Sequence, residues 1–267
     1  MEPGPKKFMD ESQPQPMPEN PPPSATTLTA RLTNVFVSPS DVFDEVKAGP
    51  PTNANWIAPL VITMIVQIIF VMVIFSQPAV LQTIKDAKDK KAEEIQQMVA
   101  KGKMTQQQAD SAREWADRLT TPTLLRVFGI LGTVIGNSLD LFLTAGVLWL
   151  VGRSAFHAHF DYMKGVEVAG LALMITVLGA IIHMLLIVIY GNMSMTASPA
   201  LLLNHFDQTN KVHLILAALN VFTLWYVAIL SVGLARLSGT SFFKAAALLY
   251  SLWAILTLGP IWLFAGK

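Results

Sequence analysis

The sequence contains no cysteine among its 267 residues, and only 14% of its residues are charged. The lack of cysteine excludes disulfides, thiolate metal sites and cysteine nucleophiles. The formal net charge of +1, with no basic stripe interleaved with aromatic residues, argues against nucleic-acid binding. Residues 1–12 carry charges but no apolar core, so they do not read as a cleavable signal peptide, and the first membrane span is expected to direct insertion.

Apolar residues are abundant instead. They make up 52% of the chain, and the mean hydropathy is +0.48, which is the balance of an integral membrane protein. Five apolar stretches are near or above the roughly 20 residues that a helix needs to cross a bilayer. They cover about residues 56–77, 123–151, 166–190, 212–235 and 243–264. We therefore predict an all-α, polytopic membrane protein with five transmembrane helices, whose odd number places the two termini on opposite sides.

Two segments precede the first span. Residues 1–27 are rich in proline and poor in apolar residues, which predicts a disordered tail that serves as a spacer or as a proline-rich ligand for a partner domain. Residues 28–55 are amphipathic, and Ser38, Pro39 and Asp41 form a helix-start pattern within them. This pre-membrane segment either lies on lipid or packs on the bundle. The membrane domain then covers residues 56–264.

A polar insert separates the first two spans. It covers residues 82–120, and its core from 85 to 119 holds eight Lys or Arg and seven Asp or Glu. Two helical segments are joined by a turn at residues 101–104, and Thr105 with Gln108 forms a capping-box pattern at the start of the second. We expect an extramembrane helical hairpin that folds independently of the bundle. It contains no histidine, so its charges are interpreted as a solvated face rather than a catalytic site.

The second span carries a carboxylate, Asp140, deep inside an apolar stretch. At roughly 100° per residue, Thr133, Asn137, Asp140 and Thr144 share one helical face. A carboxylate that faces lipid costs at least about 2.5 kcal/mol near the bilayer centre, so this face is expected to point toward other helices. Gly129, Gly132 and Gly136 lie on or beside it and would allow a close approach. We therefore predict that this span is the central packing element.

The fourth span offers a partner for that face. Asn220, Thr223 and Ser231 give it a mild polar face. Hydrogen bonds between the two spans, worth about 1 kcal/mol each, would account for both polar faces without a transport function. The candidate intramembrane polar site therefore comprises Thr133, Asn137, Asp140, Thr144 and Asn220. The alternative is that the Asp140 face lines a path for protons, ions or a small solute, as intramembrane carboxylates often do.

Other chemistry finds little support in the sequence. His157 and His159, with Asp161 nearby, form an isolated His-x-His pattern of poor specificity, so no metal site is predicted. Glu167 and His183 lie on nearly opposite faces of the third span and do not form one relay. No nucleophile–base pair or metalloprotease motif is present, so no catalytic or cofactor-binding residue is assigned.

Short motifs along the chain carry a resemblance to a known family. They are Val35–Phe36–Val37–Ser38–Pro39, Trp56 with Pro59, Asn220–Val221–Phe222–Thr223–Leu224–Trp225, Leu230–Ser231–Val232–Gly233, and Gly239 with Lys244–Ala245–Ala246 and Trp253. Over about residues 31–264 the sequence resembles the bacterial branch of the Yip (Ypt/Rab-interacting protein) membrane-domain family. The resemblance implies five spans, a cytoplasmic N-terminus and no established catalytic residues. Eukaryotic members bind small GTPases in vesicle traffic, but no motif in this sequence justifies assigning a small GTPase as its partner.

Basic residues in the short loops predict the orientation. One side has Arg153, Lys164, Arg236 and Lys244, and the other has Lys211 and Lys267. This bias favours a cytoplasmic N-terminus, although the basic residues of the hairpin argue the opposite way. We follow the short loops because a folded, charge-balanced hairpin can be translocated as a unit. The resemblance to the bacterial branch of the family implies a bacterial inner membrane. Lys164 and Lys244, each next to aromatic residues at a span start, are expected to reach the headgroup level.

The sequence predicts a non-enzymatic integral membrane protein that organises membrane or partners. Its contacts would be the lipid bilayer and other membrane or cytoplasmic proteins, through the N-terminal tail or the hairpin, with no cofactor and no nucleic acid. A homo-oligomer stays open. The alternative function is a small transporter or channel that uses the polar face around Asp140.

Overall fold

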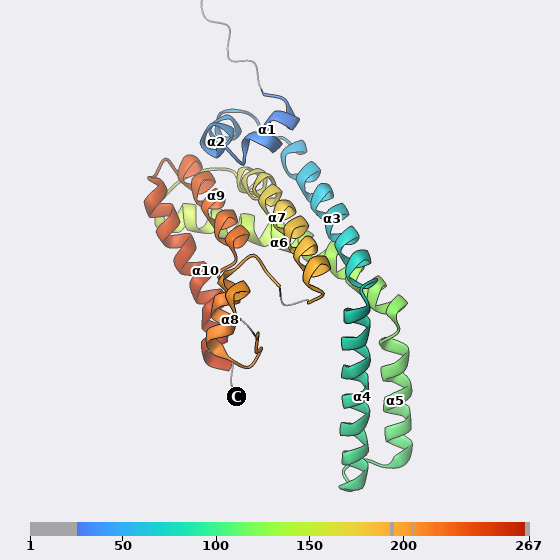
Figure 1. Ribbon diagram of the computed structural model, residues 1–267. Helices are drawn as coiled ribbons and strands as arrows, with labels where there is room; N and C mark the ends of the chain where they lie inside the picture. Colours follow the sequence, from blue (N-terminus) through green and yellow to red (C-terminus); the bar gives the residue numbers. More distant parts are fainter. Residues whose placement is uncertain (1–25, 193–194, 204, 265–267) are drawn as a thin grey trace, which may run out of the picture.

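The computed structural model describes residues 26–192, 195–203 and 205–264, so the predicted tail lies almost entirely outside the described residues. The described chain is helical, with no strand (Figure 1). Five of its helices are long and apolar enough to cross a membrane, namely α3 (Ala54–Ile74), α6 (Pro122–Ala155), α7 (Tyr162–Tyr190), α9 (Val221–Ser238) and α10 (Phe242–Phe264). The predicted fold class, an all-α protein with five spans, is therefore confirmed.

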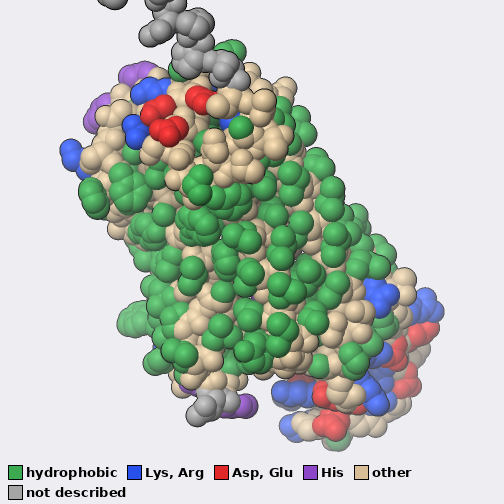
Figure 2. All heavy atoms as spheres, turned by 45° about the horizontal axis from the view of Figure 1, so that its top comes forward, with side chains coloured by type: hydrophobic (Ala, Val, Ile, Leu, Met, Phe, Trp, Pro, Cys, Tyr) green, Lys and Arg blue, Asp and Glu red, His purple; other side chains and the backbone are tan. Residues whose placement is uncertain are grey.

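Other helices lie at the two ends of this bundle. Helices α1 (Leu28–Asn34) and α2 (Pro39–Ala48) cover one end, and α4 (Pro78–Ala100) with α5 (Gln106–Leu119) projects from the other (Figure 1). The short helices η1 (Pro199–Leu202) and α8 (Lys211–Ala218) precede α9. Figure 2 shows a broad apolar belt between charged side chains at both ends of the molecule. This distribution is that of a protein embedded in a bilayer.

The centre of the bundle is α7. It packs against α3, α6 and α9, and every residue from Lys164 to Leu173 is buried. Helix α6 instead crosses the bundle obliquely (Figure 1) and leaves Leu139 and Leu143 exposed along its outer side. The prediction that the second span is the central packing element was therefore wrong. Both spans are apolar and rich in small residues, and the sequence pattern does not say which of two such helices the others surround.

Glycines on α7 allow its neighbours to come close. A β-carbon at Gly170 would lie 2.5 Å from the backbone Cα of Trp56 on α3, and one at Gly165 would lie 3.1 Å from the carbonyl oxygen of Ala145 on α6. Helices in lipid associate through such close packing, because apolar surface alone gains little there. The glycines that bring the helices together thus lie mainly on α7, rather than on the Asp140 face.

The fourth apolar stretch is not one helix. The predicted span at 212–235 is divided into α8 and α9 at Leu219 and Asn220. The Asn220 side-chain oxygen accepts hydrogen bonds from the amides of Phe222 and Thr223, which starts a new helix, and the Val221 amide donates to the Ala197 carbonyl at 2.9 Å. The membrane-crossing part therefore begins at Val221.

The hairpin between the first two spans forms as predicted. Helices α4 and α5 pack on each other, with an ion pair of 2.8 Å between Lys88 and Asp117. Both hydrogen bonds of the Thr105–Gln108 capping box are present. At the base of the hairpin, Arg126 of α6 donates a hydrogen bond of 2.9 Å to the carbonyl of Phe75, which follows the last residue of α3. This contact fixes the position of the short link between α3 and α4. The hairpin therefore has its own packing and its own caps.

The pre-membrane segment packs on the bundle. Helix α2 begins at Pro39 as predicted, although Ser38 makes no side-chain capping bond. Val42, Phe43 and Val46 are buried against the membrane helices, and α2 lies against α9 and α7. Of the two alternatives for this segment, the structure has the one in which its apolar face contacts protein.

We expect Gly170→Ala to destabilise the bundle by about 1–3 kcal/mol, because the new methyl group would push α3 away from α7. Gly132→Ala on α6 is the matched control, since a β-carbon there meets nothing within 4 Å and alanine favours a helix by up to about 1 kcal/mol. Thermal unfolding of the purified proteins in detergent measures the difference. Equal stability of the two variants would contradict the tight α3–α7 contact.

Candidate functional site

The predicted polar face lies on α6, and its residues are unequally covered. Thr133, Asn137 and Thr144 are half-buried, whereas Asp140 is exposed at the side of the bundle. Of the glycines beside this face, Gly129 approaches Val71 of α3, but a β-carbon at Gly132 or Gly136 would meet nothing. The face therefore turns only partly toward other helices.

Tyr226 of α9 is the residue that meets this face. Its hydroxyl lies near Thr144 and Asp140, and its oxygen is buried without a hydrogen bond of ordinary geometry. Asn220, the partner that the sequence suggested, instead caps α9 at its start. Tyr226 was missed by the sequence reasoning, although it follows Asn220 and Thr223 at helical spacing and continues their polar stripe.

Tyr226 also borders a cavity inside the apolar belt. The cavity has a volume of about 420 Å³, opens on the surface of the bundle, and is bordered by α3, α7, α9 and α10 together with the end of α8. Several of its lining residues carry polar side chains, namely Gln67, Thr176, His183, Asn220, Thr223, Tyr226 and Thr257. No acid or permanently charged group lines it among the described residues, so its chemistry suits hydrogen bonding to a neutral polar group. Tyr226 connects this cavity to the Asp140 face.

A second polar cluster lies at the α1–α2 end of α7. Lys164 and Glu167 form an ion pair in which Nζ lies 3.2 Å from Oε1, and only 7% of Lys164 and 1% of Glu167 are exposed. Lys164 also donates to the carbonyls of Val46 at 2.6 Å and Gly49 at 2.8 Å, at the end of α2. We expected both Lys164 and Lys244 to point outward to the headgroups. Lys164 is instead buried against protein carbonyls, whereas Lys244 is exposed. The i, i+3 spacing of opposite charges was the available sequence signal for this pair.

The cluster continues into the pre-membrane segment. Asn55 donates to Glu167 Oε2 at 2.6 Å and accepts from Arg31 at 3.3 Å. Arg31 in turn pairs with Glu45 at 3.2 Å. Five side chains from α1, α2, α3 and α7 thus form one connected network, which we call the anchor network: Arg31, Glu45, Asn55, Lys164 and Glu167. Because its members lie far apart in the sequence, local patterns did not indicate it.

The remaining predicted chemistry is placed as follows. Asp161 caps α7 by accepting from the Met163 amide at 3.1 Å, and His157 lies in the preceding loop. Within the described ranges, no three His, Cys, Asp or Glu residues converge as metal ligands. His183 contacts the ring of Phe70 with a centroid distance of 5.3 Å, whereas Glu167 belongs to the anchor network. These two residues belong to separate clusters, as their helical positions predicted.

The fold and the polar clusters together define a class, a five-span helical integral membrane protein whose pre-membrane segment is joined to the bundle by buried hydrogen bonds to an ion pair of the central helix. Residues 33–263 match the Yip1 domain, and the chain belongs to this family. No curated protein and no solved structure matches it. The Yip1 family is not an enzyme family, and membership suggests a membrane scaffold or partner role.

We expect Glu167→Leu to destabilise the protein by about 3–5 kcal/mol, because it leaves the Lys164 ammonium buried without its counter-charge. Lys164→Met should cost a similar amount, and the double variant less than the sum of the two. The pair Lys88 and Asp117, in which Lys88 is half-buried and Asp117 is exposed, is the matched control, since removing either partner should cost at most about 1 kcal/mol. Denaturant unfolding in detergent gives the free energy of unfolding of each variant. Additive losses for Lys164 and Glu167 would show that they are not coupled.

Proposed function

We propose that this protein is a non-enzymatic scaffold that presents partner surfaces on the two sides of a membrane. The observation that carries the proposal is the placement of two extramembrane elements at opposite ends of the apolar belt, with α1–α2 at one end and the α4–α5 hairpin at the other (Figure 1, Figure 2). Membership of the Yip1 family supports a scaffold or partner role. The fold is thus used to hold two surfaces in place rather than to build a reaction centre.

The α1–α2 end has the properties of a rigid platform. The anchor network joins it to α3 and α7, and Asp44 of α2 pairs with Arg236 of α9 at 3.2 Å. A segment that is held by buried polar contacts cannot lift away without exposing unpaired charges to an apolar environment. This platform follows the N-terminal tail directly and would position the tail for partners on that side.

The hairpin end offers a groove. Between α4 and α5 lies a cavity of about 670 Å³ whose floor includes Ile84, Ala92 and Ile95. Three cations and two carboxylates line it, which leaves one net positive charge. Two helices leave an apolar seam open that a third can cover, so the occupant we propose is an amphipathic helix of a partner protein with an acidic flank.

A second candidate function follows from the intramembrane cavity. Tyr226 lines it and also faces Asp140, so polar groups continue from the side of α6 toward the interior of the bundle. Such a continuous polar path is what a transporter of protons or a small polar solute requires. The scaffold remains the first proposal because the pre-membrane segment and the hairpin are both fixed by hydrogen bonds, caps and ion pairs. The cavity lining, in contrast, contains no carboxylate within the described residues.

We propose that the N-terminus lies in the cytoplasm, because Arg153, Arg236 and Lys244 lie at the α1–α2 end of the bundle. The resemblance to the bacterial branch of the family supports a bacterial inner membrane. Single cysteines at Thr29 in α1 and Ala100 at the hairpin tip, both exposed, test the orientation in a chain without native cysteine. In spheroplasts an impermeant maleimide should label the cysteine at position 100 and not that at position 29. The reverse pattern would overturn the orientation, and labelling of both from one side would overturn the five-span topology.

Ala87→Glu tests the groove, because Ala87 is exposed at its edge and a carboxylate there would be buried beneath a docked helix. We expect recovery of co-purified partner from native membranes to fall at least about tenfold, with no loss of bundle stability. Ala100→Glu, an exposed alanine outside the groove, is the control and should keep the partner.

Two further variants separate the scaffold from the transporter. Replacing residues 85–119 by a flexible linker should leave an inserted, monodisperse bundle that has lost the partner, whereas Asp140→Asn should keep both. Equal partner recovery by wild type and the linker variant would contradict the scaffold. Solute or proton flux in proteoliposomes that Asp140→Asn abolishes would establish the transporter instead, since an amide does not titrate.

A further inference from the structure

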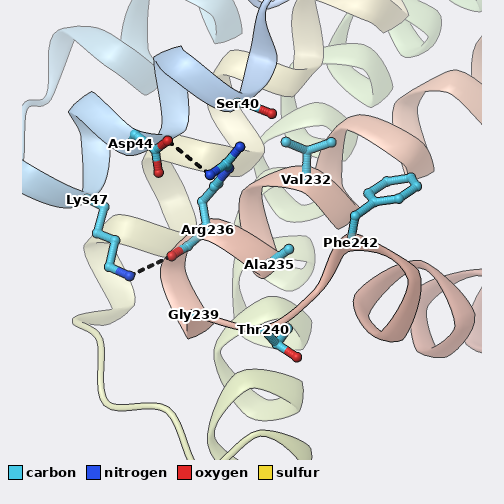
Figure 3. Close-up of a pocket in the computed structure, with 9 residues that line it drawn as sticks. All are labelled: Ser40, Asp44, Lys47, Val232, Ala235, Arg236, Gly239, Thr240 and Phe242. Atoms are coloured by element: carbon cyan, nitrogen blue, oxygen red, sulfur yellow. Dashed lines mark hydrogen bonds and ion pairs between the residues drawn. The ribbon is translucent and has the colours of Figure 1, made fainter.

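A third cavity lies at the edge of the apolar belt, between α2 and the turn that joins α9 to α10 (Figure 3). Its volume is about 460 Å³. Because α9 ends at Ser238 and α10 begins at Phe242, the cavity lies where two spans leave the membrane. This is the level at which phospholipid headgroups are found.

The cavity has an excess of positive charge. Arg236 pairs with Asp44 at 3.2 Å through one guanidinium nitrogen, and Lys47 Nζ donates to the Arg236 carbonyl at 2.8 Å. Asp44 is the one acidic side chain among the described lining residues, against two cations. One positive charge is therefore left without a counter-charge, and the hydroxyls of Ser40 and Thr240 lie on the same cavity as hydrogen-bond donors.

The other side of the cavity is apolar. In Figure 3 the charged side chains gather on one side, and Val232 and Phe242 lie on the opposite side. The neighbouring Phe243 is 81% exposed at the start of α10, where an aromatic ring is expected to enter the lipid. A binding site that combines cations, hydroxyls and an apolar wall at the membrane surface complements an amphiphile rather than a soluble anion.

We propose that this cavity binds the headgroup phosphate of an anionic phospholipid from the leaflet on the α1–α2 side. Arg236 and Lys47 provide the charge, and Ser40 and Thr240 donate hydrogen bonds to the phosphate oxygens. The upper part of the acyl chains lies along Val232 and Phe242. The site is assembled from α2 and α9–α10, so it exists only while the pre-membrane segment is docked. It does not depend on the scaffold function proposed above.

Mixed micelles that contain the full-length protein and either phosphatidylglycerol or phosphatidylcholine provide the test, with bound lipid counted by native mass spectrometry. We expect phosphatidylglycerol to bind more tightly than phosphatidylcholine, and Lys47→Gln to weaken phosphatidylglycerol roughly fivefold. Lys101→Gln, which removes an exposed cation at the hairpin turn, is the control and should bind as wild type does.

Asp44→Asn distinguishes charge recognition from loss of structure. Both Asp44→Asn and Lys47→Gln remove a contact between α2 and α9, but they change the cavity charge in opposite directions. We expect Asp44→Asn to strengthen phosphatidylglycerol binding while Lys47→Gln weakens it. Equal weakening by both variants, or equal binding of the two lipids by wild type, would overturn the proposal. Displacement of the lipid by millimolar glycerol phosphate would assign the site to a soluble phosphate and would also overturn it.

Discussion

The buried ion pair between Lys164 and Glu167 is the interaction on which the arrangement of this protein depends. Two opposite charges that are almost fully withdrawn from water are stable only when their remaining hydrogen-bonding capacity is met. Here the end of α2 supplies two carbonyl oxygens to Lys164, and Asn55 supplies an amide to Glu167. The pair thus requires the pre-membrane segment to be in place. The central helix and the pre-membrane segment form a single structural unit for this reason.

The docking of the pre-membrane segment on α7 also affects a site outside the anchor network. The cavity at the membrane surface is formed partly by α2 and partly by the α9–α10 turn, so its geometry depends on the same docking. At the opposite end, α4 and α5 pack chiefly on each other, and Val80 at the start of α4 packs against Ile74 of α3 and Ile187 of α7. The hairpin thus contacts the bundle through an apolar cluster at its base, whereas the pre-membrane segment is held through buried polar contacts.

The Asp140 face has a different character from the anchor network. Its carboxylate lies on the exposed side of α6, and the residue that meets the face from within the bundle, Tyr226, has a buried hydroxyl without an aligned partner. The pair of Lys164 and Glu167 in the anchor network is buried between the pre-membrane segment and α7, whereas Asp140 is exposed at the side of α6 and Tyr226 also borders the neighbouring polar cavity. Polar residues within membrane spans are the positions where helix association or transport is expected to act.

The sequence determined the elements whose cause is local. Apolar length set the five spans, proline and capping residues set the starts of α2 and α5, and the density of charge marked the hairpin. Which span lies at the centre was decided by tertiary packing, because Gly170 acts through its close contact with Asn55 and Trp56, more than one hundred positions earlier in the chain. The same holds for the site: helical spacing placed Asp140 and Thr144 on one face, but Tyr226 and the Asn55 amide that binds Glu167 come from other helices. Long-range contacts in a membrane bundle depend on interhelical geometry, which the periodicity of a single helix does not contain.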